Sequence, residues 1–91
     1  MNDRAPSLRL DKWLWHARFC RTRAIAQARA ASGLIRLNGN RVEKPAARVR
    51  VGDTVTVPTA REAVVVKVLA LGMRRGPPTE ARALYETIEG A

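Results

Sequence analysis

Residues Arg9 to Pro45, which read RLDKWLWHARFCRTRAIAQARAASGLIRLNGNRVEKP, decide the fold of this chain. The stretch contains two apolar patterns with helical spacing, an Arg-Thr-Arg elbow between them, and a glycine followed by a hairpin signal. Nine of its residues are Arg or Lys, and they gather at the elbow, on outer helix faces and around the hairpin. We interpret this stretch as a cationic platform for a polyanion.

The first apolar pattern predicts a helix over residues 8–20, with Ser7 as a candidate cap. Its core face holds Leu10, Trp13, Leu14, Ala17 and Cys20, and a flanking basic stripe holds Arg9, Lys12 and His16. Leu8, Trp15 and Phe19 fall opposite the core face. They could stack on unpaired bases, but we favour the interpretation that the C-terminal segment covers them.

At the elbow, Thr22 is a good cap for a second helix from Arg23 to about Ser32. Arg21 and Arg23 lie at the positive end of that helix's dipole, where they cost stability. A bound anion would offset this cost, because free N–H groups at a helix start also favour phosphate. This reasoning fails if acidic side chains of the same molecule pair with both arginines.

The second helix is rich in alanine. We expect its inward face to contain Ala24, Ile25, Ala28 and Ala31, and its outward side to present Gln27 and Arg29 beside Arg23. Gln27 could offer a donor and an acceptor to a base edge or a ribose hydroxyl. An exposed glutamine is, however, also simply a good helix former.

Gly33 fits the position just past a helix end, where the backbone turns through positive φ. Ile35 to Leu37 alternates as a strand does, and Asn38-Gly39 is a strong hairpin signal. Three further cations, Arg36, Arg41 and Lys44, would then extend the cationic surface onto the hairpin.

The rest of the chain predicts a small sheet. Residues 47–51 and 54–57 alternate as short strands, and the Val-rich residues 63–71 form its spine with Lys67 pointing to solvent. Residues 72–78 form a loop, after which Thr79 would cap a closing helix. That helix would contain Ala81, Leu84, Tyr85 and Ile88.

Charge favours nucleic acid as the partner. The 91 residues, one domain in size, hold 17 Lys and Arg against 8 Asp and Glu, a formal charge of +9. Residues 1–58 carry 12 basic and 4 acidic side chains, or +8, whereas 59–91 carry 5 and 4, or +1. A single cysteine, no long uncharged run and no signal-like start indicate a cytoplasmic protein without a membrane partner.

No catalytic constellation appears. His16 and Cys20 are too few for a zinc site, and we expect a surface imidazole and a core thiol. The sequence lacks a phosphate-binding glycine loop, a nucleophile elbow and a plausible carboxylate pair, so we predict a non-enzyme without a cofactor or metal. No aromatic residue occurs between Cys20 and Leu84, which argues against stacking sheets and favours recognition of folded RNA through phosphate, ribose and shape.

Taken in order, these motifs resemble the S4 RNA-binding domain, also called the alpha-L motif. The matching residues are Arg9-Leu10-Asp11, Arg21-Thr22-Arg23, Ala24 to Ala31, Gly33, Asn38-Gly39 and Lys44-Pro45. Arg9 to Trp15, Ala17 to Phe19 and Met73 to Glu86 are further similar to the free-standing bacterial heat-shock members of this class. Those members often carry a longer basic tail beyond the point where this sequence stops.

The resemblance implies one α+β domain over residues 1–91, with two N-terminal helices packed on a small, mainly antiparallel sheet and a closing C-terminal helix. The core motif would span about 8–57, and a strand and the C-terminal helix about 62–89. It implies a non-catalytic protein that binds large-subunit ribosomal RNA and helps to rescue subunits stalled with nascent chain-tRNA. With the residue analysis, the expected RNA-binding residues are Arg9, Lys12, Arg18, Arg21, Thr22, Arg23, Gln27, Arg29, Arg36, Asn38, Arg41 and Lys44.

Two other functions fit parts of the sequence. The short connection and basic second helix also suit a helix-turn-helix DNA reader. S4 domains also occur together with enzymes, and this resemblance suggests an RNA-targeting module acting with an enzyme partner. We expect a monomer, with tRNA and DNA as further candidate partners.

Overall fold

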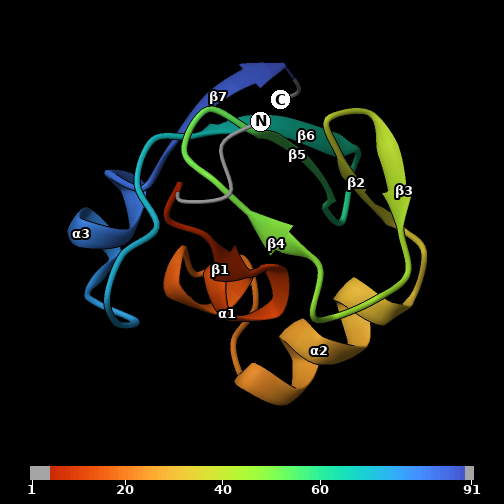
Figure 1. The fold of residues 1–91 in the computed structure, drawn as a ribbon, viewed down its shortest axis with the longest axis horizontal. Helices are drawn as coiled ribbons and strands as arrows, with labels where there is room; N and C mark the ends of the chain where they lie inside the picture. The colour runs from red at the N-terminus through yellow and green to blue at the C-terminus, as the bar shows by residue number, and fades with distance from the viewer. Residues whose placement is uncertain (1–4, 90–91) are drawn as a thin grey trace.

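The computed structural model describes residues 5–89. Helices α1 and α2 lie on one side of a curved sheet, and α3 and the β2–β3 hairpin lie at opposite ends of the molecule (Figure 1). The elements are β1 (Leu8–Arg9), α1 (Leu10–His16), α2 (Arg23–Ala31), β2 (Ile35–Leu37), β3 (Asn40–Val42), β4 (Arg48–Val49), β5 (Thr54–Pro58), β6 (Ala63–Val68), α3 (Pro78–Arg82) and β7 (Tyr85–Glu89).

The main sheet is antiparallel throughout, with strand order β3-β2-β5-β6-β7. β6 pairs on both sides, so the Val-rich segment is an inner strand as predicted, and Lys67 on it is exposed. A separate two-stranded sheet joins β1 to β4, with Leu8 opposite Val49. The α+β class and the antiparallel sheet are therefore confirmed.

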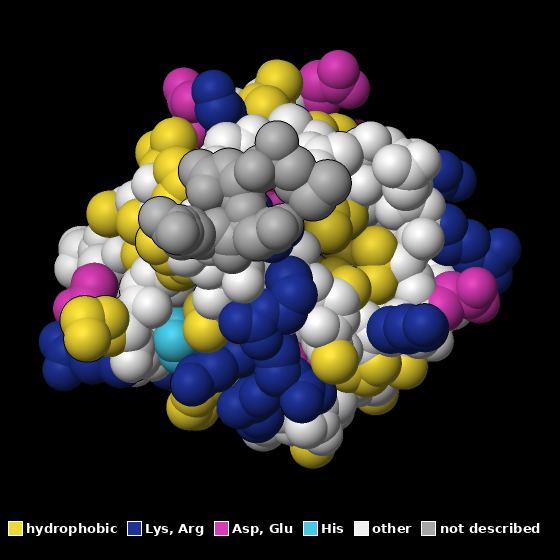
Figure 2. Space-filling model, in the orientation of Figure 1, with side chains coloured by type: hydrophobic (Ala, Val, Ile, Leu, Met, Phe, Trp, Pro, Cys, Tyr) yellow, Lys and Arg dark blue, Asp and Glu magenta, His cyan; other side chains and the backbone are white. Residues whose placement is uncertain are grey.

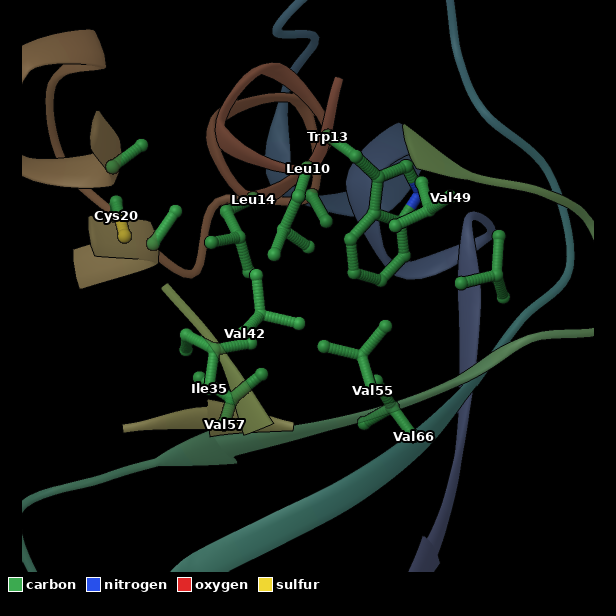
Figure 3. Close-up of a cluster of buried hydrophobic side chains, with 14 of the residues drawn as sticks. Leu10, Trp13, Leu14, Cys20, Ile35, Val42, Val49, Val55, Val57 and Val66 are labelled. Atoms are coloured by element: carbon green, nitrogen blue, oxygen red, sulfur yellow. The ribbon is translucent and has the colours of Figure 1, made fainter. Parts of the chain in front are cut away.

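The core forms where α1 packs against the sheet. Leu10, Trp13 and Leu14 are fully buried and point toward sheet valines that include Val55 and Val66 (Figure 3). The indole Nε1 of Trp13 donates to the carbonyl oxygen of Ala70 at 3.0 Å, so the buried polar atom has a partner. The predicted core face of the first helix is confirmed, including Ala17 and Cys20.

The first helix is shorter than predicted because Arg18 ends it. Arg18 has φ of 64°, and the N–H groups of Arg18 and Phe19 donate to the carbonyls of Trp15 and Leu14. This is a Schellman ending with arginine where glycine is usual. Ser7 does not cap the helix, since Arg9 occupies the N-cap position and the Ser7 hydroxyl accepts from Arg48.

The bounds of α2 agree with the prediction, but its predicted inward face is wrong. The Thr22 hydroxyl accepts from the Ile25 N–H at 3.1 Å and caps the helix. Ala26 and Ala30 are fully buried, whereas Ala24, Ile25, Ala28 and Ala31 are exposed. A helix of small residues lacks the contrast between bulky apolar and polar faces on which a wheel depends.

The hairpin forms as predicted. Asn38 and Gly39 have φ of 52° and 83°, and β2 pairs with β3 so that Ile35 is opposite Val42. Positive φ at both turn positions is the geometry that Asn-Gly favours. Gly33, with φ of 82°, likewise follows the end of α2.

The predicted C-terminal helix is mostly wrong. Its helical part, α3, ends at Arg82; Pro77 rather than Thr79 precedes it, without a side-chain cap. The segment from Tyr85 onward is strand β7, which pairs with the edge of β6 and satisfies that strand's backbone groups. The expectation that this segment covers the first helix is confirmed for Phe19, whose ring centroid lies 4.7 Å from that of Tyr85.

No helix within residues 5–89 is long and apolar enough to cross a membrane.

Candidate nucleic-acid interface

The predicted site centres on one buried carboxylate. Asp11 is fully buried in the first turn of α1, and the guanidinium of Arg9 donates to it with Nε at 3.1 Å and Nη2 at 2.9 Å. Nη2 of Arg23 lies 3.6 Å from Oδ1 of Asp11. Asp11 therefore holds two arginines from different elements side by side, although both keep more than a third of their side chains exposed.

The two elbow arginines differ in their surroundings. Arg23 has an internal partner in Asp11, whereas no hydrogen bond or ion pair involves Arg21 within residues 5–89, and Arg21 is exposed. The argument that a bound anion must offset the helix dipole therefore holds for Arg21 and is weakened for Arg23. Thr22 between them is committed to capping α2.

Pairing of β1 with β4 adds a cation that the sequence interpretation missed. Arg48 lies directly opposite Arg9 in the ladder, and its guanidinium donates to the hydroxyl and carbonyl oxygens of Ser7. Like charges directly opposite each other are unfavourable in a sheet. The sequence showed only an alternating strand at Arg48, because its partner is far away along the chain.

The segment after the hairpin brings Lys44 to the start of α1. The N–H groups of Leu10 and Asp11 donate to the carbonyls of Ala47 and Pro45, so the chain around Lys44 runs along the N-terminus of α1. Arg41 and Lys44 line the same shallow hollow beside Ala47.

We call these side chains, together with Lys12, the basic face. Figure 2 shows Lys and Arg side chains gathered over α1 and α2 in the centre and lower part of the view. The carboxylates that form ion pairs with it within residues 5–89 are Asp11 and Glu43, the latter 3.8 Å from Arg41. The basic face consists of Arg9, Lys12, Arg21, Arg23, Arg41, Lys44 and Arg48.

Arg36 lies beside the basic face on the outer side of the sheet. It is directly opposite Arg41 in the hairpin, a second pair of facing arginines, and both are exposed. Its Nη1 donates to the Gly39 carbonyl at 3.4 Å. The outer sheet surface at the hairpin end thus carries two facing arginines, of which Arg41 has a carboxylate partner in Glu43.

Two predicted RNA-binding residues have roles within the fold. The Arg18 guanidinium donates through Nε to the Gly76 carbonyl at 2.6 Å, which ties the end of α1 to the distal loop. The Asn38 amide accepts from the Thr54 N–H and donates to Asp53, which fastens the hairpin tip to β5. Their contact with RNA stays a prediction.

Gln27 and Arg29 are both exposed on α2. Arg29 lies away from Asp11, at a cleft that it shares with Phe19. The structure thus brings Arg9 and Arg23 together at Asp11 and leaves Arg29 on a separate surface.

His16 does not lie on the surface, which corrects the predicted basic stripe. Its side chain is 1% exposed, and Nδ1 lies 3.2 Å from the Leu71 carbonyl oxygen, so the neutral ring donates there. Burial lowers the pKa of His16, the nearby charges of Lys12 and Arg23 lower it further, and the Leu71 hydrogen bond opposes them. Burial also raises the pKa of the Cys20 thiol, which is a core group as predicted.

The arrangement can neutralise and position phosphates. Guanidinium groups grip phosphate oxygens with paired hydrogen bonds, and those of Arg9 and Arg23 are held in place by Asp11. Residues 5–89 contain no group of three or more His, Cys, Asp or Glu side chains that could hold a metal ion.

Known proteins share the part of the chain that carries the basic face. The model of the S4 domain family matches residues 8–55. Heat shock protein 15 of Escherichia coli (strain K12) is 42% identical over 82 residues, which cover 90% of this chain and 61% of that protein. Small ribosomal subunit protein uS4 of Nitratidesulfovibrio vulgaris (strain DP4) is 35% identical over 72 residues, 77% of this chain and 35% of the relative.

A solved structure shares the whole fold. Trimeric heat shock protein 15 of Vibrio cholerae superposes with a TM-score of 0.85 at 32% sequence identity, over 91% of this chain and 83% of that one. The chain spans less than two thirds of the length of the heat shock protein 15 of Escherichia coli. With the family model covering α1, the elbow, α2, the hairpin and the start of β5, this chain belongs to the S4 domain family.

Proposed function

We propose that this chain is a non-catalytic, cytoplasmic protein that binds ribosomal RNA through its basic face. The finer proposal is that it binds the large ribosomal subunit and helps to rescue subunits stalled with nascent chain-tRNA. Similarity to heat shock protein 15 and to ribosomal protein uS4 supports the ribosomal setting.

The observation that carries the proposal is the facing of arginines across both small ladders. Arg9 is opposite Arg48, and Arg36 is opposite Arg41. Within residues 5–89, the carboxylates that pair with these four arginines are Asp11 at Arg9 and Glu43 at Arg41. A fold selected for stability alone would not align like charges in this way. A bound phosphate would relieve this repulsion. Binding would also release counterions from the RNA, which adds to the binding free energy.

The exposed side of α2 favours recognition of backbone and shape over base sequence. Ala24, Ala28 and Ala31 offer no hydrogen bonds to base edges, whereas small side chains let the helix approach a ribose-phosphate backbone closely. A helix-turn-helix DNA reader would instead place several base-reading polar side chains along its second helix, whereas after the first turn of α2 the exposed polar side chains are Gln27 and Arg29. RNA is therefore the partner that the geometry supports best.

The test is co-sedimentation of the chain with purified large subunits, with small subunits and with duplex DNA as a competitor. We expect retention on large subunits that falls steeply between about 50 and about 300 mM salt. A variant with Arg21→Ala and Lys44→Ala should lose retention. Its matched control has Arg61→Ala and Arg82→Ala, which remove the same charge from exposed positions outside the basic face.

Three outcomes would contradict the proposal. Retention that does not respond to salt would exclude phosphate contacts as the source of binding. Equal losses in the two double variants would reduce the effect to net charge. Displacement by duplex DNA at concentrations equal to those of the subunits would favour the DNA reader.

A further inference from the structure

A cleft apart from the basic face lies between α2 and the end of β5. It has a volume of about 550 Å³, within the range of small-ligand sites. Phe19, Val57 and Pro58 supply an apolar lining, Leu34 stands at its rim, and Arg29 is its charged residue. An apolar slot with one cation suits a ligand that is flat and apolar at one end and anionic at the other.

The aromatic wall of the cleft is held rigidly. The Phe19 ring packs against Tyr85 at a centroid distance of 4.7 Å and against Trp13 at 5.9 Å. Phe19 is only half-buried, so part of its side chain remains open to the cleft. A ring that is already immobilised loses little entropy when another flat group stacks on it.

Two groups at the cleft are unused by the fold. Leu34 is 62% exposed, a large apolar side chain without a packing role that accounts for its position. The Arg29 side chain is exposed, and its guanidinium forms no hydrogen bond or ion pair with any residue among 5–89. Arg29 and Leu34 also border a second hollow, lined by Ile25 and Ala28, on the other side.

We propose that this cleft receives an unstacked nucleobase of the bound RNA, with Arg29 on the adjoining phosphate. The base lies against Phe19 between Leu34 and Pro58, and the neighbouring ribose rests in the hollow beside Ile25. This proposal rests on the proposed function and adds to it a preference for RNA with a bulged or single-stranded nucleotide.

The experiment compares two RNA hairpins that differ in one bulged adenosine. The wild-type chain should bind the bulged hairpin more tightly, and Arg29→Gln should reduce that preference. The preference is measured as the ratio of the two affinities, so that a loss of affinity common to both hairpins cancels. Stacking of one base corresponds to a preference of roughly 5- to 100-fold. Arg82→Gln is the matched control, an exposed arginine on α3 outside both surfaces, and should keep the preference.

A second readout does not depend on the Arg29 variant. Methyl resonances of Leu34 and Val57 should shift when the bulged hairpin is added and stay in place with the paired one. Phe19→Leu keeps an apolar side chain but removes the ring, and should reduce both the shifts and the preference.

The outcomes separate the two proposals. If paired and bulged hairpins bind equally and the methyl resonances do not respond, the cleft does not take a base, while RNA binding itself stands. If neither hairpin nor ribosomal RNA binds, the proposed function fails together with this inference. If an acidic peptide with an aromatic residue shifts Leu34 and Val57 while RNA does not, the cleft belongs to a protein partner and the inference is overturned.

Discussion

The two elbow arginines allow a sharp test, because the structure assigns them different roles. Arg23→Ala removes one of the two cations that hold the buried Asp11, while Arg21→Ala removes an exposed charge without an internal partner. We expect Arg23→Ala to lower the free energy of unfolding and Arg21→Ala to leave it unchanged or raise it slightly. Both should weaken RNA binding.

The magnitudes follow from burial and distance. The Arg23 side chain is 37% exposed and lies 3.6 Å from Asp11, which keeps its two contacts from Arg9, so its loss costs about 1 kcal/mol. For a chain of this size, that corresponds to a melting temperature lower by roughly 4–8 °C. Removing Arg21 relieves repulsion with the α2 dipole worth at most a few tenths of a kcal/mol, roughly 0.3.

The assays are urea denaturation and RNA binding measured at several salt concentrations. Each lost phosphate contact should reduce the slope of log affinity against log salt by about 0.9, and Arg21→Ala should show close to this full change. Arg23→Ala should show less, because Asp11 already neutralises part of its charge. Equal destabilisation by the two substitutions, or an unchanged salt slope for Arg21→Ala, would refute the division of roles.

Two further predictions follow from Gly33 and from His16. Gly33→Ala and Gly39→Ala impose the same strain at φ of 82° and 83°, about 1–2 kcal/mol each, but only a Cβ at Gly33 meets the Arg41 guanidinium, at 2.8 Å. Both should lower the urea midpoint similarly, and Gly33→Ala alone should weaken RNA binding by displacing Arg41. His16 has a folded pKa below its ordinary 6.5, so the unfolded chain binds more protons and stability should fall as the pH drops below about 6.5. Urea denaturation curves recorded at intervals of about one pH unit between about pH 8 and about pH 5 measure this loss.

Each of these predictions has its own control. An equal effect of the two alanine substitutions on RNA binding would mean that the position of Arg41 is irrelevant. For the pH dependence, His16→Asn places an amide N–H at the position of Nδ1, where it can donate to the Leu71 carbonyl, but cannot titrate near neutrality. If this variant showed the same loss of stability below pH 6.5, other groups would account for it.

Local signals in the sequence were sufficient for several elements. The Thr22 cap, the Gly33 stop and the Asn38-Gly39 turn all act within a few residues, so tertiary packing does not need to be known to interpret them. The core face of α1 was equally clear, because bulky Leu and Trp residues recur there at intervals of three and four residues.

Other features depended on which segments meet. The C-terminal residues have apolar spacing compatible with a helix, yet β6 offers an unpaired edge, and Tyr85 to Glu89 complete the sheet as β7. His16 is polar enough to expect on the surface, but the loop that carries Leu71 covers it. Neither the edge nor the loop is visible from residues nearby in the chain.

Composition and short-range capping and turn preferences suffice to predict a small, strongly basic α+β domain with two helices and an arginine-rich hairpin. The arrangement of those charges in space follows from the tertiary fold. This fold buries Asp11 between Arg9 and Arg23, and it sets Arg48 against Arg9. The physical reason is that electrostatic interactions depend on distance in space, and the chain brings these groups together only when α1 packs on the sheet.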